Sequence, residues 1–472
     1  MSRVAIIGAQ GRFPGGAPEP EAFFQQLMAG ACWAGPVPPE RWSAARFQAT
    51  EKAAGKMVVE GGSFLDPDVQ GFDPDVFGLA PEETACLDPQ QRLLLEVAWE
   101  ALERAALDPA ALAGRPVGVY VGGFTTDHLL NQFAAPARGG LGRFSAVGST
   151  LTMLANRLSH VFDLRGPSLT VDTACASSLS ALALAVRDLE AGACSLALVG
   201  GASVMLRPEY PLAMAAAGLL ARDGRCKPFS VRADGYGRGE GAAVLVLKPV
   251  AQASADGDRV WAVIEGVGQG HGGRTAGIAL PHGAAQQEVM ARVLAATGLD
   301  PSDIGYVEAH GTGTERGDAV EAAAIGAVYG RGRASALPIG SVKANIGHLE
   351  AAAGVAGVIK ALGILQARCL PPHRLEGAPS PAIPFAALGL RLARAGEPLG
   401  ASRVAVNAFG YGGSLVHVIL GPGPPDSGTA LGAAPLGEVL AGEVLVPLGA
   451  PSAPALAEGC ERLARASTPP IR

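Results

Sequence analysis

The sequence lacks the features that mark nucleic-acid-binding and membrane proteins. Its 472 residues include 37 Lys and Arg against 43 Asp and Glu, a net charge of −6, and the basic residues form no cluster. A protein whose main partner is nucleic acid carries a basic patch, so we expect no nucleic-acid partner. No Lys- or Arg-rich amphipathic stretch points to a membrane surface, and no uncharged run is apolar enough to span a bilayer. We therefore expect no membrane partner either.

Paired cysteines are also absent. The seven cysteines are odd in number, scattered, and never form a CxxC pair: Cys32, Cys86, Cys175, Cys194, Cys226, Cys369 and Cys460. This pattern indicates a reducing compartment and no structural zinc. The N-terminal MSRVAIIGAQGRFPGG has one short apolar run followed by Gly and Pro, which is not the longer apolar region of a signal peptide. We expect a cytoplasmic protein that binds no metal.

A short apolar strand that leads into a cysteine and then a helix organises the chain. Ser168–Val171 has the β-branched pattern of a buried strand, and Ala176–Leu189 is so rich in Ala and Leu that we expect a buried helix. Cys175 would lie at the helix N-terminus, where free N–H groups and the helix dipole favour a thiolate by up to about 2 kcal/mol. Such a cysteine is either a nucleophile or a packed small residue, and this stretch alone does not decide between them.

Two further segments place a histidine at a turn after a strand. They are VEAHGTGT around His310 and SVKANIGHLEAAAG around His348. Together with Cys175 they make a Cys-His-His set, which is a combination that can do nucleophilic and proton-donor chemistry. The other histidines have no such context, and we expect them to be surface or packing residues: His128, His160, His271, His282, His373 and His417.

The chain divides into two halves with one layout. The strand and helix around Cys175 correspond to residues 341–365 in the second half, and both helices consist of small apolar residues, as if they packed together inside. This predicts an α/β fold with an internal duplication and two buried helices between sheets dominated by parallel strands. Other expected elements are the strand Arg3–Gly8, irregular structure over 32–78, and the helices Pro20–Met28, Asp88–Leu107, Gly283–Thr297 and Gly317–Tyr329.

The end of the chain differs in composition from the rest. We interpret residues 1–422 as one domain and 423–442, which are rich in Pro, Gly, Ser and Ala, as a linker. Residues 443–472 resemble the start of a further domain, truncated at Arg472.

Four motifs together resemble one enzyme family. VDTACASSL, VEAHGTGT, SVKANIGHLEAAAG and NAFGYGGS are similar to the β-ketoacyl synthases of the thiolase superfamily, specifically those of type I polyketide synthases, over residues 3 to about 422. LDPQQRLLLEVAWEALERA, ANRLSHVFDLRGPS, DGRCKPF and GYGRGEG add to the resemblance. It implies the duplicated, five-layered αβαβα thiolase fold, normally a homodimer. It also implies that 443–472 begin the linker domain that joins such a synthase to a downstream acyltransferase.

The resemblance assigns catalytic roles residue by residue. Cys175 would take an acyl group as a thioester, and His310 and His348 would hydrogen-bond a malonyl thioester and stabilise the enolate that forms as carbon dioxide leaves. Lys343 would organise the site electrostatically. The backbone N–H groups of Cys175 and Tyr411 would form the oxyanion hole. The implied reaction is a decarboxylative Claisen condensation.

The same resemblance describes how substrates arrive. They would be carried on the phosphopantetheine of an acyl carrier protein, with Thr312 and Thr314 holding the amides of this arm and no cofactor bound by the domain itself. Asp318 and Glu321 would tie down the helix that follows. We expect a gate loop consisting of Phe409, Gly410, Tyr411, Gly412 and Gly413, in which the Tyr411 ring blocks malonyl entry until Cys175 is acylated.

Three other functions compete with this interpretation. A cysteine-protease-type hydrolase fits the order of Cys175 and His310, but the chain has no CGSCW-like sequence. A degradative thiolase needs a second cysteine near the C-terminal glycine loop, and FGYGGS has none. A non-elongating domain or chain-length-factor-like partner usually loses the cysteine or a histidine, whereas this chain keeps all three.

Some glycine-rich segments depart from familiar patterns. GYGRGEG and GYGG look suited to holding phosphate, but neither lies in the strand-GxGxxG-helix context that nucleotide binding requires. Residues 414–417 and GQGHGGRT also differ from the sequences common in the family, which leaves the subtype open.

Overall fold

The computed structural model describes residues 3–51, 53–65, 69–424 and 457. The predicted linker from residue 425 on and, apart from residue 457, the predicted start of a further domain over 443–472 lie outside the described residues.

The two halves of the chain repeat one strand order, as predicted. The first half contributes five strands in the spatial order β5-β4-β6-β7-β1, and the second contributes five in the order β10-β9-β14-β15-β8. Numbered along the chain within each half, both orders are 3-2-4-5-1. The strands are β1 (Val4–Arg12), β4 (Val117–Gly122), β5 (Ser168–Val171), β6 (Leu196–Ser203), β7 (Gly241–Pro249), β8 (Ala262–His271), β9 (Ile304–Glu308), β10 (Leu337–Gly340), β14 (Arg403–Phe409) and β15 (Ser414–Pro422).

Strands of one direction dominate each half, as predicted, with one strand reversed. In each half the first three strands of the spatial order pair in parallel and the last runs in their direction, while the strand between them, β7 or β15, pairs antiparallel on both sides. The reason is visible between β14 and β15, which are joined by the short loop 410–413, because adjacent strands joined by so tight a turn can only be antiparallel. Antiparallel pairing of β1 with β8 joins the halves into an 11-stranded sheet, with β12 (Leu390–Leu392) at one edge.

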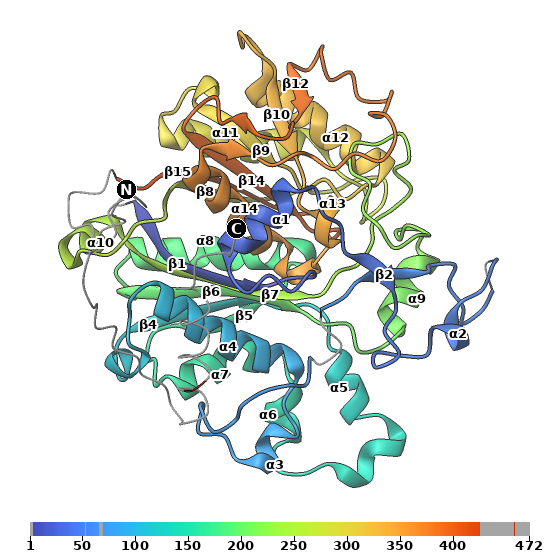
Figure 1. The fold of residues 1–472 in the computed structure, drawn as a ribbon, viewed down its shortest axis with the longest axis vertical. Helices are drawn as coiled ribbons and strands as arrows, with labels where there is room; N and C mark the ends of the chain where they lie inside the picture. The colour runs from blue at the N-terminus through green and yellow to red at the C-terminus, as the bar shows by residue number, and fades with distance from the viewer. Residues whose placement is uncertain (1–2, 52, 66–68, 425–456, 458–472) are drawn as a thin grey trace, which may run out of the picture.

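Helices cover both outer faces of this sheet and fill the space between its halves. Figure 1 shows α4 and α7 on one outer side, α11 and α12 on the other, and α8 and α14 between the two halves. This is the predicted five-layered αβαβα arrangement. The helices are α4 (Pro89–Arg104), α7 (Met153–Val161), α8 (Ser177–Glu190), α11 (Gly283–Thr297), α12 (Glu315–Ile325) and α14 (Ala353–Ala367).

The two central helices pack closely because small residues face each other. The N–H of Val355 at the start of α14 donates to Ser178 Oγ on α8 at 3.1 Å. A Cβ atom on Gly354 would lie only 2.5 Å from Cγ of Leu179, so this contact requires glycine. Residues 350–367 are long and apolar enough to cross a membrane, with a mean hydropathy of 1.3, but 83% of that stretch is buried inside the fold. α14 is therefore a core helix.

Shorter elements connect these layers. Asp88 caps α4 by accepting the N–H of Gln90 at 2.9 Å, as its position before the helix predicts. Further helices are α1 (Pro20–Met28), α2 (Ala44–Phe47), α3 (Pro81–Thr84), α5 (Asp127–Gln132), α6 (Ser145–Ser149), α9 (Glu209–Ala216), α10 (Val250–Asp256) and α13 (Lys343–Ile346). Small sheets pair β2 (Ala34–Pro36) with β3 (Gly61–Ser63) and β11 (Cys369–Leu370) with β13 (Glu397–Pro398).

Candidate active site

Cys175 lies at a sharp turn between β5 and α8, at the start of the central helix as predicted. The turn is a short 3₁₀ segment, Ala174–Ala176, in which Ala174 has φ 53°. A residue other than glycine in this left-handed region costs roughly 1–3 kcal/mol, so neighbouring bonds must hold it. The Ala174 N–H donates to Asp172 Oδ1 at 2.9 Å, and Ser177 Oγ accepts the N–H of Thr173 at 2.9 Å.

Burial of Cys175 opposes the thiolate that the helix N-terminus favours. Burial between the central helices raises the pKa of the Cys175 thiol to about 12, and the carboxylate of Glu350 adds to the rise. The charge of Lys343 and hydrogen bonds from backbone N–H groups act in the opposite direction but do not outweigh burial. The helix N-terminus is thus present, but desolvation decides the protonation state.

Two backbone N–H groups converge on the Cys175 sulfur. They belong to Tyr411 and to Cys175 itself, and both act on the sulfur so as to lower its pKa. These are the two donors that the sequence predicted for an oxyanion hole. A carbonyl bound to the sulfur would have its oxygen within reach of groups that already point at this spot.

His310 and His348 face each other across the same site. Their ring centroids lie 5.4 Å apart with the ring planes at 83°. The N–H of Phe409 donates to Nδ1 of His310 at 3.3 Å, and the N–H of Glu350 donates to Nδ1 of His348 at 3.2 Å. Because Nδ1 accepts in each ring, the proton of the neutral imidazole lies on Nε2. Nε2 of His348 is buried and has no hydrogen-bond partner among the described residues.

Both histidines are neutral at physiological pH. Burial first, and the charge of Lys343 second, hold the pKa of each ring well below its ordinary value. Neutral rings with Nε2–H groups are hydrogen-bond donors toward the cavity. This is the form required for stabilising a developing negative charge without prior proton transfer.

Lys343 is buried at the start of α13, beside all three groups. Burial lowers the pKa of its ammonium, while the carboxylates of Glu308 and Glu321 oppose that shift. Its charge lowers the pKa of the cysteine and of both histidines. The predicted electrostatic role of Lys343 therefore has a physical basis, although the residue lies outside the wall of the cavity.

Two carboxylates of α12 hold the loop 310–314. Glu321 accepts the N–H groups of His310 at 2.7 Å and of Gly311 at 2.8 Å. Asp318 accepts the N–H of Gly313 at 3.2 Å, and burial raises its pKa to about 7. These bonds tie the helix to the loop, so His310 is fixed through its own backbone.

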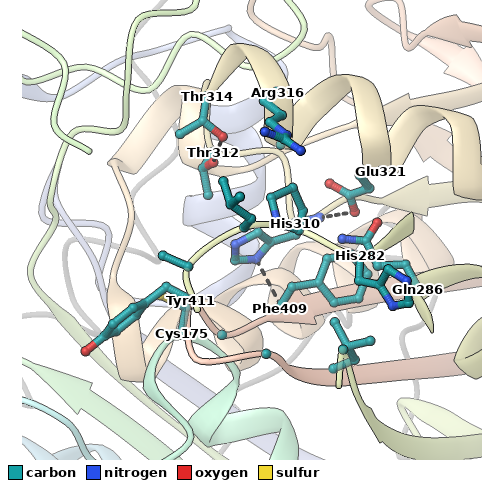
Figure 2. A pocket seen from close by; sticks show the side chains of 18 of the residues that line it. Cys175, His282, Gln286, His310, Thr312, Thr314, Arg316, Glu321, Phe409 and Tyr411 are labelled. Atoms are coloured by element: carbon teal, nitrogen blue, oxygen red, sulfur yellow. Dashed lines mark hydrogen bonds between the residues drawn. The ribbon is translucent and has the colours of Figure 1, made fainter. Parts of the chain in front are cut away.

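A cavity of about 240 Å³ joins these groups. Cys175, His310 and His348 line it, together with Thr312 and Thr314, whose hydroxyl groups lie 3.3 Å apart. Figure 2 shows the two threonines above His310 and Cys175 below it. The site residues predicted from four separate motifs thus meet in one place.

The cavity also has lining residues that the sequence did not indicate. His282, predicted to be a surface or packing residue, contributes to the wall together with Gln286 and Arg316 (Figure 2). Their segments carry no recognisable chemical motif, and only the folding of α11 and α12 over the loop 310–314 brings them here. Gln286 is buried with Oε1 unpartnered among the described residues.

The predicted gate loop is a hydrogen-bonded turn between β14 and β15. Gly410 donates its N–H to Ser414 O at 2.8 Å, and Gly413, with φ 99°, donates to Gly410 O at 2.9 Å. The Tyr411 ring is 42% exposed and packs against Phe124 with 6.0 Å between centroids. In Figure 2 this ring points away from His310, so it does not lie between His310 and Cys175.

The remaining histidines mostly behave as predicted. His417 is fully buried, and its ring nitrogens pair with Asn407 Oδ1 at 2.6 Å and with the Tyr329 hydroxyl at 2.7 Å. His373 is buried against Pro228 O at 3.1 Å.

In the part of the chain that the structure describes, no group of three or more His, Cys, Asp and Glu side chains is arranged to hold a metal ion.

Models of known protein families match most of the chain. Residues 1–253 match the N-terminal domain of β-ketoacyl synthase, and residues 261–375 match its C-terminal domain. The chain is 43% identical over 425 residues to a phenolphthiocerol/phthiocerol polyketide synthase of Mycobacterium tuberculosis, covering 89% of this chain and 27% of that protein. It is also 43% identical over 424 residues to a highly reducing polyketide synthase of Penicillium oxalicum, covering 88% of this chain and 17% of the other. The chain therefore spans about a quarter or less of these relatives.

Solved structures show the same architecture. The oxazolomycin ketosynthase domain of Streptomyces albus superposes with a TM-score of 0.85 at 37% identity, over 90% of this chain and 75% of the other. The ketosynthase from module 6 of the bacillaene synthase of Bacillus subtilis superposes with a TM-score of 0.82 at 32% identity, over 90% and 72%. With its thiolase-type layers and a Cys-His-His site in one cavity, the chain belongs to the β-ketoacyl synthase family and is a ketosynthase domain of the polyketide synthase type.

Proposed function

We propose that this domain catalyses a decarboxylative Claisen condensation. An acyl group bound to Cys175 combines with a malonyl-type thioester on an acyl carrier protein, giving a β-ketoacyl thioester on that carrier and carbon dioxide. One arrangement carries the proposal. A buried cysteine lies close to two backbone N–H groups, and two neutral histidines in the same cavity hold their protons on Nε2.

The first step is transfer of the acyl group to the cysteine. Sulfur attacks the thioester carbonyl of the incoming acyl carrier, and the carbonyl oxygen becomes an oxyanion held by the N–H groups of Cys175 and Tyr411. Each donor of this kind contributes roughly 2.7–4 kcal/mol to the transition state. The C–S bond to the carrier then breaks, and the thiol proton of Cys175 ends on the released carrier thiol.

The second step uses the histidines. Nε2–H groups of His310 and His348 donate to the thioester oxygen of the malonyl unit, and the bond to its carboxylate breaks to release carbon dioxide and leave an enolate. The enolate carbon attacks the acyl carbonyl on Cys175. The tetrahedral intermediate expels the Cys175 thiolate, which takes up a proton from solvent water because burial disfavours its charge.

The domain acts with partners in this proposal. The carrier delivers substrates on phosphopantetheine, with Thr312 and Thr314 at the end of the cavity where its amides pass, and the domain needs no bound cofactor. β5 forms one end of the large sheet, and its free edge is where a second copy of the chain would pair to form a homodimer. An acyltransferase domain follows in the full cytoplasmic polypeptide.

Intact-protein mass spectrometry tests the proposal. After exposure to a panel of acyl thioesters, the wild-type protein gains one acyl mass, and addition of malonyl carrier protein releases carbon dioxide and a β-ketoacyl carrier product. The Cys175→Ala variant gains no acyl mass. Acyl loading without any condensation product would instead identify a non-elongating domain.

A further inference from the structure

The motif GYGRGEG, which has no role in the reaction as described, encloses His348. The N–H of His348 donates to Gly237 O at 2.7 Å, and the N–H of Gly239 donates to His348 O at 2.8 Å. The ring of Tyr236 packs on the ring of His348 with 5.2 Å between centroids. A Cβ atom on Gly239 would lie 2.5 Å from Ile346 O, so this glycine allows the motif to approach the backbone that leads to His348.

Arg238, at the centre of this motif, clamps Glu350 in the protein interior. Its Nε donates to Oε1 of Glu350 at 2.7 Å and its Nη2 to Oε2 at 2.6 Å. The two side chains are 3% and 2% exposed. A bidentate pair of this kind fixes the orientation as well as the position of the carboxylate.

Glu350 in turn is held in an unfavourable backbone conformation beside His348. Its φ is 46°, in the left-handed region that glycine favours. In this conformation its N–H points back to Nδ1 of His348 at 3.2 Å. A strained backbone persists only where its surroundings over-determine it, and the Arg238 clamp supplies that constraint.

We propose that Arg238 is a positioning residue for the second half-reaction: by clamping Glu350, it keeps the Glu350 N–H on Nδ1 of His348 and so keeps the His348 proton on Nε2, toward the substrate. This inference rests on the proposed function, because it assigns Arg238 to the decarboxylation that His348 would assist. It predicts that Arg238 matters less for acyl transfer to Cys175, which does not use the His348 donor.

The charge of Arg238 acts in the same direction as its geometry. It is one of the positive charges that lower the pKa of His348, after burial, Lys343 and His310. It also neutralises the Glu350 carboxylate, which is the second cause of the raised pKa of Cys175. Loss of Arg238 would leave that carboxylate buried beside the histidine, where it favours the imidazolium over the neutral donor.

The chain offers a matched control two residues away. Arg41 and Glu240 form a second buried pair, with Nε to Oε1 at 2.8 Å and side chains 1% and 0% exposed. Within the described residues, Glu240 also accepts the N–H groups of Leu65 and Met205 and does not bond to His348. Breaking either pair leaves one buried charge unpaired and lowers Tm.

The test compares three rates in purified protein with acyl and malonyl carrier proteins: acylation of Cys175, release of carbon dioxide, and formation of the condensation product. Arg238→Met is expected to slow decarboxylation about tenfold or more, because a histidine in the wrong tautomer loses its donor, and to slow acylation less, because the unpaired Glu350 carboxylate further raises the pKa of Cys175. Arg238→Lys should recover part of the loss. Arg41→Met should lower Tm to a similar degree and leave the ratio of the two rates unchanged.

A neutral double variant, Arg238→Met with Glu350→Gln, removes the clamp without leaving a buried charge, and we expect the same split between the two rates. Equal loss of both rates in this variant, or the same split in Arg41→Met, would overturn the role of Arg238. If the wild-type protein loads acyl groups but never condenses them, the proposed function fails, and the two failures are thereby distinguished.

Discussion

The backbone N–H of Phe409 donates to Nδ1 of His310 across 3.3 Å, and Phe409 is the last residue of β14. The next residues are the glycine turn that brings the Tyr411 N–H to the Cys175 sulfur. The end of β14 therefore orients His310, which would donate to the enolate, and leads directly to Tyr411, whose N–H would donate to the oxyanion. A change in this turn would reach both half-reactions.

Replacement of the cysteine is the simplest test of the site. Cys175→Ala should abolish acyl loading and condensation and leave the fold intact, because it removes the thiol and little buried volume. Intact mass measures loading, and thermal unfolding checks the fold. Acyl mass that still appears on the variant would point to another cysteine.

The raised pKa of Cys175 predicts how alkylation depends on pH. With a pKa of about 12, the thiolate fraction should keep rising through the measurable range, so the rate of alkylation by iodoacetamide should increase about tenfold per pH unit from pH 8 to 9.5. A small free thiol, with a pKa of about 8.5, levels off in that range. Cys175→Ala corrects for the other cysteines. A plateau below pH 9 would mean that the helix N-terminus outweighs burial and that Cys175 has a pKa below 9.

The histidines should separate the two half-reactions. His310→Ala and His348→Ala should each slow carbon dioxide release more than acyl loading, because their Nε2–H groups act on the enolate and not on the first acyl transfer. His160→Ala, an exposed histidine of α7, is the control. A variant that condensed at the parent rate would return that histidine to a structural role.

Lys343 gives a prediction about pH with a definite sign. Its charge lowers the pKa of both histidines and of Cys175, so Lys343→Met should raise all three. Decarboxylation requires neutral histidines, and its decline at acid pH should therefore begin at a higher pH in the variant. Acyl loading near neutrality should slow as well, because the thiol becomes harder to ionise. An unchanged pH profile would remove the electrostatic role.

The sequence predicted those parts of the site that lie within contiguous motifs. Cys175, His310 and His348 each sit in a strand-to-turn segment that is recognisable on its own, and their meeting in one cavity follows from the duplicated layout. Membership of the β-ketoacyl synthase family also removes the cysteine-protease alternative.

Properties that depend on distant segments could not be predicted in this way. The Arg238–Glu350 pair joins residues 112 positions apart, and neither motif indicates the other. The raised pKa of Cys175 could not be predicted because the helix N-terminus is a local feature, whereas burial arises from the packing of both halves around the residue. The antiparallel pairing of β14 with β15 depends on a loop whose shortness became clear only with the strand bounds.

The Tyr411 ring provides the last prediction, on the order of substrates. The ring lines the cavity, is 42% exposed and contacts Phe124, while its backbone N–H bonds to the Cys175 sulfur. Acylation of that sulfur would occupy the place where this N–H now bonds, so the turn 410–413 must adjust, and the ring moves with it. If the ring restricts malonyl entry before acylation, Tyr411→Ala should raise premature decarboxylation by the unacylated protein relative to condensation, since the backbone donor remains.

Tyr411→Phe is the matched control for this prediction, because it keeps the ring and removes only the hydroxyl. It should retain the wild-type ratio of decarboxylation to condensation, measured as carbon dioxide release against β-ketoacyl product with and without prior acylation. In Figure 2 the ring points away from His310, so a changed ratio in Tyr411→Ala would not come from space freed between His310 and Cys175. An unchanged ratio in Tyr411→Ala would leave the residue with its backbone role alone.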